Sequence, residues 1–572
     1  MVLKRFLPVV GRELREAARQ KATYWNRVVA VSVALMIFFL FWLAMRREPA
    51  HELGKALFYS LSALAGMICL LAGSGVADSI SREKREGTLG LLFLTNLSGY
   101  DVVAGKISAG SLGAAYRVIA ILPIMAIGFL FGGVEFEMYV RVVFACANSM
   151  LLSLALAAYW SSRLTTSWAA VMAWLATMAF LVVGIPFGAG LIASSIPYFH
   201  ITQDLLPYYL SIFTLSPGFT AVMAVGPKMY FGQFYYLFWI SLIVQHLIAW
   251  RAFHLASKRT ESIWREQELQ LTRQNRGRKL KDILKRLFHW LRWRHQPVLN
   301  EEPISWLVRR SRLGLNITLI IFAATTFIFT LGWFLDPDDW RDSDGYSFIM
   351  TMTHLWLLGW MAGEAATWIF RDRQSGAMEL ILATPLQVRE ILREHFRGIN
   401  RKLLWPVVWV IIADVFFMMH DRTYYHGVKF QYFRYVIWIA LIGMLLFNLY
   451  VLRWTATWMG LISRNEFNAA VGGLIWLSLP TWGIIVAGAF LMFMFSEVLK
   501  WPMAKEFSRQ FEEWHFLSVW LILGTVNNLV LLWISRRECL RMRDYASLRS
   551  ESGFWAQMKY VVGLFKPRTV QV

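Results

Sequence analysis

The chain has 572 residues, of which 57% are hydrophobic, and carries a formal net charge of +21. Apolar runs of 18 or more residues recur along it, and about 20 such residues cross a bilayer core, so the sequence excludes a soluble globular protein. The basic residues lie mostly at the ends of these runs and in one central linker, so the positive-inside rule accounts for them without a nucleic-acid partner. We predict an all-α polytopic membrane protein.

The N-terminal segment Leu3–Lys21 is amphipathic and has no signal-peptide cleavage pattern. We expect this segment, which we call the elbow, to lie in the plane of the membrane surface. The alternative is a charged tail with no such role. About 12 spanning helices follow as two six-helix repeats, and Pro123 and Pro406 are predicted to kink the third helix of each half. The predicted spans are Val28–Met45, Ala56–Ile80, Val103–Phe131, Tyr139–Ser161, Trp168–Ile192 and Phe231–Trp250, then Leu315–Leu335, Tyr346–Phe370, Leu403–Met419, Phe433–Met459, Ala469–Phe495 and Phe516–Ile534.

The charge pattern divides the chain and predicts its orientation. The segment 251–300 is strongly basic, so we expect a cytoplasmic linker there and cytoplasmic termini on both sides of it. The acidic loops "GGVEFEM" and "LDPDDWRDSDG" then lie outside, and only Arg46 and Arg47 depart from the rule. The predicted parts are a first half (1–250), the linker (251–300), a second half with its own elbow (301–545) and a tail (546–572).

A charged segment follows the second predicted span of each half. We call Ser81–Ser98 ("SREKREGTLGLLFLTNLS") hook 1 and Phe370–Gln387 ("FRDRQSGAMELILATPLQ") hook 2. The two align without a gap, so Arg82 matches Arg371 and Gly87 matches Gly376. An ordinary loop is the usual explanation of such a segment, but its recurrence at the same place in both halves argues against one. We predict a charged turn, a glycine and a short helix in each hook.

The apolar residues of each hook share one helical face, with spacing i, i+3, i+4 and i+8, and we expect that face to lie on the membrane. "TPLQ" predicts a helix start at Thr384, with Pro385 as first residue and Gln387 at the capping-box position. Ser98 and Asp101 form a weaker version of this box. The matched apolar pairs are Leu89 with Met378, Leu92 with Ile381, Phe93 with Leu382, and Leu97 with Leu386.

A second match supports a duplication. "YWSSRLTTSWAAV" and "MGLISRNEFNAAV" each place Ser-Arg (Ser162–Arg163 and Ser463–Arg464) in a predicted cytoplasmic turn before the fifth helix of a half. Both halves would enter from the cytoplasm, so they would have the same orientation and be related by a pseudo-twofold axis along the membrane normal.

Hook 1 resembles the signature of ABC transporter permeases of the type 2 exporter class, an acidic–Gly–Thr–Leu–Glu–x–Leu–x–x–Thr–Pro–Leu–Ser run after the second helix. Hook 1 fits through Glu86 to Leu89, Leu91, Thr95, Leu97 and Ser98, and departs at Gly90 and Asn96. Hook 2 keeps the Glu and Pro that hook 1 lacks, and itself departs at Ser375 and Ala377. The elbow, the six-helix plan and "LSPGFTAV" before the sixth helix extend the likeness over most of the chain.

The resemblance implies the permease part of an ATP-driven exporter in a bacterial-type inner membrane, with an unknown substrate. ATP and Mg would be bound by a separate cytosolic ATPase subunit, expected as a dimer, so this chain would not be an enzyme and would hold no cofactor. The two hooks would be the elements through which this chain is coupled to the ATPase. The residues implied are Arg82, Glu83, Lys84, Arg85, Glu86, Gly87, Thr88 and Thr95 in hook 1, and Arg371, Asp372, Arg373, Gly376, Glu379, Thr384 and Pro385 in hook 2.

Motifs for other chemistry are weak or missing from the sequence. No GxxxxGK[ST] phosphate cradle occurs, and "GYDVVAGKIS" has the wrong spacing and Ile107 where Ser or Thr belongs. HExxH, CxxC and GxSxG do not occur, and the three cysteines are predicted free thiols. His420, Asp421 and His426 could form an external metal site, although a polar loop explains them more simply.

Two other functions stay open. One is a non-transporting membrane component that passes ATPase motion to an external partner, although the external loops look small for this. The other is an ion- or proton-driven carrier, which needs ionisable groups within the membrane. Asp78, Glu364 and Asp414 are the candidates, and helix capping or helix–helix hydrogen bonds are the simpler explanation of all three.

Overall fold

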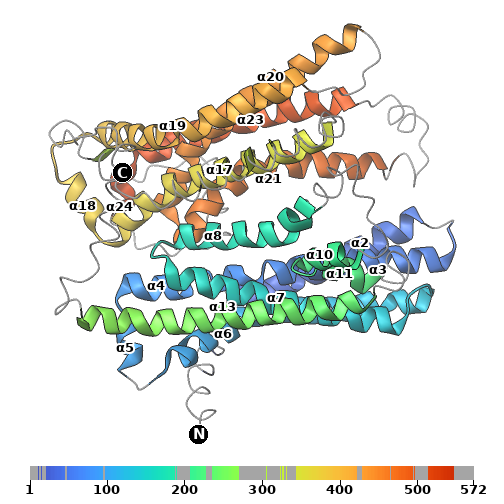
Figure 1. Cartoon of the computed structure of the whole chain (residues 1–572). Helices are drawn as coiled ribbons and strands as arrows, with labels where there is room; N and C mark the ends of the chain where they lie inside the picture. The colour runs from blue at the N-terminus through green and yellow to red at the C-terminus, as the bar shows by residue number, and fades with distance from the viewer. Residues whose placement is uncertain are drawn as a thin grey trace, which may run out of the picture. The chain divides into compact units, whose positions relative to one another are not determined.

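The structure is a computed structural model, in which every regular element of the described residues is a helix. The chain divides into two compact units, Met1–Trp293 and Arg294–Val572, with the boundary inside the predicted linker (Figure 1). The described residues are 11, 15, 21–45, 48–94, 97–186, 188–189, 206–226, 235–269, 304–305, 318, 322–323, 325–326, 330, 343–420, 428–463, 465–493, 495 and 513–546.

Ten helices among the described residues are long and apolar enough to cross a membrane, so the chain is an all-α multi-pass membrane protein, as predicted. Six belong to the first half, matching the six spans predicted there. They are Tyr24–Leu43, Ala50–Glu86, Gly99–Phe131, Phe136–Arg163, Ser167–Gly184 and Tyr236–Ser262.

The other four belong to the second half and are Val388–Met419, Tyr435–Ile462, Glu466–Met492 and His515–Leu540. The predicted span Tyr346–Phe370 is helical within α17 (Ser343–Gln374) but is not among the ten, since Thr, His and Trp side chains dilute its aliphatic residues. The predicted span Leu315–Leu335 and both elbows lie almost wholly outside the described residues. The repeat of six plus six helices therefore stays a prediction.

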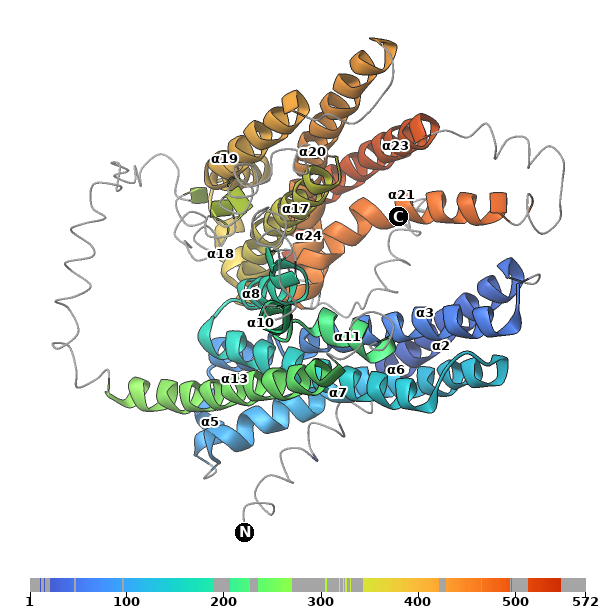
Figure 2. The same cartoon turned by 45° about the vertical axis from the view of Figure 1, so that its right-hand side comes forward.

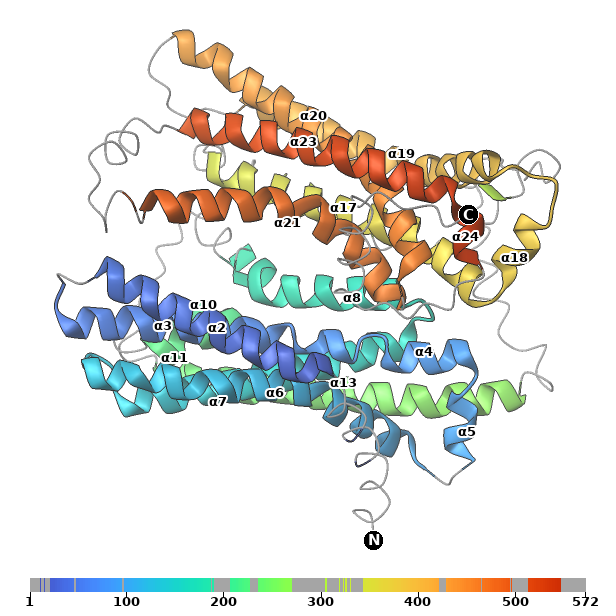
Figure 3. The ribbon, with the colours of Figure 1, turned by 180° about the vertical axis from the view of Figure 1, so that it is seen from behind.

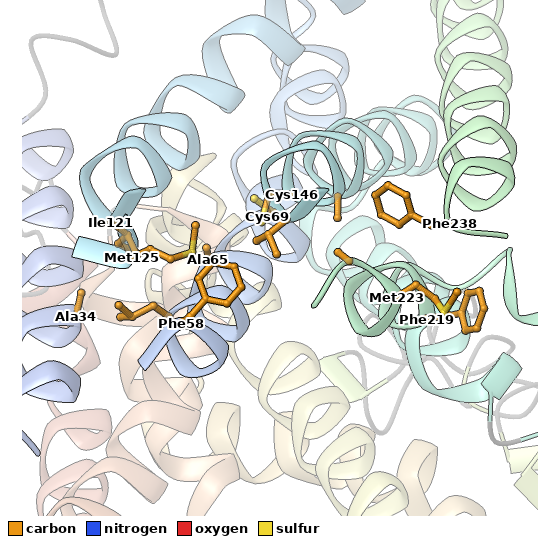
Figure 4. Close-up of a cluster of buried hydrophobic side chains, with 14 of the residues drawn as sticks. Ala34, Phe58, Ala65, Cys69, Ile121, Met125, Cys146, Phe219, Met223 and Phe238 are labelled. Carbon is orange, nitrogen blue, oxygen red and sulfur yellow. The ribbon is translucent and has the colours of Figure 1, made fainter. Parts of the chain in front are cut away.

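In the first half, long helices pack around one apolar cluster. Figure 4 shows Phe58 and Cys69 of one helix facing Met125 and Cys146 of two others. All three cysteines of the chain are buried free thiols, as predicted. The elements are α2 (Lys21–Ala44), α3 (Ala50–Leu70), η1 (Ala72–Gly75), α4 (Ser79–Glu86), α5 (Leu89–Phe93), α6 (Gly99–Phe131), α7 (Phe136–Arg163), α8 (Ser167–Ala179), η2 (Phe180–Gly184), α10 (Leu206–Phe213), α11 (Pro217–Val225) and α13 (Tyr236–Leu269).

The segment "LSPGFTAV" forms the start of α11. Ser216 caps this helix by accepting a hydrogen bond from the Phe219 amide, and Pro217 is its first residue. Buried Gln245 of α13 donates to the Thr214 carbonyl at 3.1 Å and to the Thr220 hydroxyl at 2.6 Å. Polar groups that would otherwise be unsatisfied in an apolar bundle thus fix α11 against α13.

The linker was predicted to begin at residue 251, but α13 continues as a helix to Leu269. Small side chains explain the extension, because Ala252 and Ala256 are buried and allow close packing on the start of α6. A Cβ atom at Gly99 would lie 2.3 Å from the Ser257 carbonyl oxygen, so the two backbones touch there. Tyr100 also contacts His254, with its hydroxyl 2.5 Å from Nδ1.

In the second half, α20 lies beside α17, α21 and α23 (Figures 2 and 3). The approach of α17 and α20 is close, since a Cβ atom at Gly460 would lie 2.6 Å from the Ala366 carbonyl oxygen. Pro406 sits inside a continuous helix, as Pro123 does in α6. The elements after α17 are α18 (Ala377–Leu382), α19 (Val388–His420), α20 (Val428–Ile462), α21 (Glu466–Phe493), α23 (Glu513–Leu540) and α24 (Met542–Ala546).

Candidate functional site

Both hooks turn at the predicted glycine. Gly87 ends α4 with φ 71°, and Gly376 separates α17 from α18 with φ 76°. A Cβ atom at either glycine would meet nothing within 4 Å, so the left-handed backbone, and not crowding, favours glycine there. A short helix, α5 or α18, follows each turn as predicted.

One pair of matching cations, Lys84 and Arg373, fastens each hook to a turn of its own half. Lys84 donates to the Ser161 carbonyl at 3.1 Å and also to the Ser162 carbonyl, at the end of α7. Arg373, which matches Lys84, donates to the Ser463 carbonyl at the end of α20. The two separate sequence matches, the hooks and the Ser-Arg turns, therefore meet in the same way in each half, because a cation satisfies carbonyls left free at a helix C-terminus. Arg464 lies outside the described residues.

The charges of hook 1 fall into two groups. Arg85 binds inward, 2.9 Å from the Asp78 carboxylate and 3.1 Å from the Thr165 carbonyl. Glu83 forms a mostly buried ion pair with Lys106 of α6 at 2.6 Å. Arg82 and Glu86 instead pair with each other at 2.8 Å on the outer surface. Arg85 is also exposed, so the two groups differ in their partners: Arg85 and Glu83 bind other elements and act as fasteners, whereas Arg82 and Glu86 bind each other.

In hook 2, the neighbouring charged residues Arg371 and Asp372 have different surroundings. Arg371 binds buried Glu466 of α21 at 2.5 Å. Its neighbour Asp372 matches Glu83, but the position that matches Lys106 is His395, whose ring stacks on Trp368. Burial therefore raises the pKa of the Asp372 carboxyl to about 6, although the nearby Arg371 guanidinium acts in the opposite direction.

The predicted apolar face of each hook points inward. Leu89 and Met378 are buried, and the other members of the face are half-buried among the described residues. Sequence periodicity missed the opposite face, where Leu91 is 62% exposed and the matching Leu380 is 74% exposed. Leu94 of hook 1 is also exposed. Apolar surface is therefore left uncovered beside the charges of each hook.

The helix starts after the hooks differ from the prediction. Ser98 and Asp101 form a complete capping box at the start of α6. Thr384, predicted as an N-cap, instead donates to the Ile381 carbonyl at the end of α18, and α19 begins later, at Val388. There the Gln387 amide donates to Glu390 at 2.9 Å, the counterpart of the Ser98–Asp101 contact. The carboxylate three residues into the helix, and not Thr-Pro, selects the start.

The remaining site residues are placed without special contacts. Thr88 precedes α5 with no capping hydrogen bond from its side chain. Glu379, Thr384 and Pro385 are exposed on hook 2. Thr95 lies outside the described residues.

The three carboxylates considered for ion coupling all have partners. Asp78 accepts from Arg85 and from Ser81. Glu364 pairs with buried Lys402 at 2.6 Å and accepts from Trp360. Asp414 lies 2.9 Å from His354. All three therefore fit the simpler explanation: Asp78 is a helix-end partner, and Glu364 and Asp414 form contacts between helices α17 and α19.

No group of three metal-ligating side chains occurs in the part of the chain that the structure describes. Asp421 and His426, considered for a metal, lie outside that part, as does the side chain of His420. No protein-family model matches the chain, and no curated protein matches it.

Proposed function

We propose that this chain is the transmembrane permease subunit of an ATP-driven ABC exporter. The observation that carries the proposal is the matched construction of the two hooks. Each has a left-handed glycine, a cation fastened to the Ser-Arg turn and an outward leucine, at equivalent positions. A separate cytosolic ATPase subunit, expected as a dimer, would offer one docking site to each hook.

The division of charges within each hook gives the proposal its mechanism. Inward groups such as Arg85 and Arg371 tie the hook to α7, α8 or α21, so a push on the hook moves the spanning helices. Outward groups, chiefly Leu91 and Leu380 with the Arg82–Glu86 pair, form the docking face. Because the fasteners and the docking face are different residues, they can be tested separately.

The expected location follows from charge. The basic linker and the hooks would face the cytosol of a bacterial-type cell, with both termini on the same side. The ATPase would supply ATP and Mg, and this chain would supply the path for an unidentified substrate. A non-transporting component remains an alternative, and flux of any substrate would separate the two functions. The partnered Asp414 gives the carrier alternative a specific residue.

The first experiment is mild purification from native membranes, followed by a search for a co-purifying ATP-binding subunit. We expect the double variant Leu91→Ser and Leu380→Ser to lose that subunit while the chain stays folded, because both side chains are exposed. The matched control is Leu130→Ser, an 85% exposed leucine at the other end of α6. A chain that is always purified alone, or a subunit retained by the double variant, contradicts the proposal.

A second experiment tests transmission through hook 2. Gly376→Val forces a β-branched residue into a left-handed conformation, which costs about 1–2 kcal/mol, so the turn should change shape while the bundle stays folded. We expect stimulation of the partner's ATPase activity to be lost. Gly66→Val is the control, because Gly66 is helical and has open space around it. Normal stimulation in Gly376→Val would contradict a coupling role.

A further inference from the structure

Two ionisable side chains meet inside the second half. His354 of α17 places Nε2 2.9 Å from Oδ2 of Asp414 on α19. Asp414 is 1% exposed and His354 is largely buried, and both lie inside spans predicted from the sequence, Leu403–Met419 and Tyr346–Phe370. Ionisable groups at such depth are costly and are usually functional.

The second carboxylate oxygen of Asp414, Oδ1, is buried and has no hydrogen-bond partner among the described residues. With a carboxylate and a neutral imidazole, the pair would place a negative charge in an apolar interior with one oxygen unsatisfied, which is unfavourable. One added proton makes the pair neutral, either as carboxylic acid with imidazole or as carboxylate with imidazolium. The arrangement therefore favours one bound proton.

Neighbouring charges do not compensate the pair. On α17 and α19 the nearest ion pair joins Glu364 to Lys402, and ten residues separate His354 from Glu364, about 15 Å along the helix. Among described side chains, α20 carries no charge from Tyr435 to Tyr450, and α21 carries only Glu466, which binds Arg371. Since no other ionisable side chain described on these helices supplies a countercharge to the pair, we infer that a proton does.

Burial also limits what can bind. Because Asp414 is almost completely buried, neither a metal ion with its ligands nor an organic cation can reach Oδ1 in this conformation. A proton needs no space. The ligand class that fits is therefore a proton, exchanged with water when α17 and α19 separate.

We propose that His354 and Asp414 form a proton-binding site, and that the protein exchanges one proton there in each transport cycle. The two helices that hold the site are the two that hook 2 connects, so hook movement would open it; this coupling rests on the proposed function, whereas the site itself does not. On opening, the proton passes from the pair to water and leaves the carboxylate with a neutral imidazole. The matching residues of the first half, Ala65 and Met125, cannot bind a proton, so the first half has no counterpart of this site.

The test is infrared spectroscopy of the purified full chain in lipid vesicles, between about pH 5 and about pH 8. We expect a pH-dependent carboxyl signal, from either neutral form of the pair, that Asp414→Asn removes, because the amide keeps the shape but cannot bind the proton. His354→Gln should keep a band but shift its pH midpoint, since glutamine donates a hydrogen bond and cannot be protonated. Glu135→Gln, an exposed carboxyl just before α7, should leave the pH-dependent signal unchanged.

A pH-difference spectrum that is the same in the wild-type protein and in Asp414→Asn would overturn the proposal. If Asp414→Asn does not fold, carbon-13 labelling of aspartate in the wild-type chain replaces it, and an unshifted band again overturns the proposal. The measurement uses no ATPase. A band that depends on Asp414 in a chain without an ATP-binding partner would therefore support the site and refute the exporter function.

Discussion

Helices α3 and α6 flank hook 1, and α17 and α19 flank hook 2, yet the two pairs are held together by different chemistry. Residues that match by the hook alignment differ in kind: Ala65, Gly75, Gly113 and Met125 in the first half correspond to His354, Glu364, Lys402 and Asp414 in the second. The first pair packs by close backbone approach. The second pair is joined by hydrogen-bonded ionisable groups.

This difference shows which features a duplicated hook requires and which are free to vary. The glycine turn and the cation on the Ser-Arg turn are present in both halves. The contacts that join the two flanking helices, by contrast, differ between the first half and the second. Backbone contact, as at Gly54, whose added Cβ would lie 2.4 Å from the Gly132 carbonyl oxygen, favours a fixed spacing. Paired charges depend instead on protonation and on distance, so we expect α17 and α19 to be the more responsive pair.

The largest effect should come from removing one charge of the second pair. Lys402→Met leaves Glu364 without its buried cation, and breaking a buried ion pair in this way costs about 3–5 kcal/mol. We expect a clearly lower midpoint of thermal unfolding in detergent, with most of the loss recovered when Glu364→Gln is added. Gly113→Ala, at the matching position with open space around it, should be neutral or slightly stabilising. An unchanged midpoint in Lys402→Met would remove the basis of the comparison.

An intermediate effect should follow when a residue of the first half is replaced by the residue found at the matching position of the second half. Gly99 matches Val388, and Gly99→Val would press a side chain against the Ser257 carbonyl, which costs about 1–3 kcal/mol for overpacking. We expect faster hydrogen exchange in hook 1 and in α13 beyond Ser257. The reverse change, Val388→Gly, should cost at most about 1 kcal/mol. Equal exchange in Gly99→Val and wild type would show that the backbone contact can relax.

The smallest effect should be a pH dependence confined to hook 2. The pKa of Asp372 is about 6 in the folded protein, above its ordinary value of 3.8, so the folded state binds more protons than the unfolded state between these values. The stability of hook 2 should therefore fall as the pH rises through about 6 and recover on acidification. Asp372→Asn should abolish this dependence in local hydrogen exchange. Hook 1, where Glu83 pairs with Lys106, is the internal control, and the same pH dependence there would refute the assignment.

Much of the fold was predictable because it depends on local patterns. Apolar run length located the six spans of the first half, and the glycines located both turns. α10 carried no signal that the sequence analysis used. The prediction of a helix start at Thr384 was wrong, because a Thr-Pro pair also suits a helix end. The start of α19 depends instead on Glu390, six residues later.

The candidate site was predictable only in its position along the chain. Periodicity found the inward face of each hook, but the outward Leu91 and Leu380 do not fit that period, and only packing shows that they are exposed. Charge content could not separate fasteners from surface groups, because Lys84 and Arg82 look alike in sequence. The partner of Asp414, His354, lies 60 residues away in the sequence, and the partner of Glu364, Lys402, lies 38 residues away. No local sequence pattern encodes contacts over such separations.

The continuation of α13 bears on how this protein could be made in two pieces. At 34 residues the helix is about 51 Å long, well beyond the roughly 30 Å of a bilayer core. Its far part supports the start of α6, directly behind hook 1. A pair of polypeptides encoded by separate genes would therefore need the break after Leu269. A break at residue 251, where the apolar run ends, would place residues 252–269 on the second polypeptide. The first polypeptide would then lack the helix that supports hook 1.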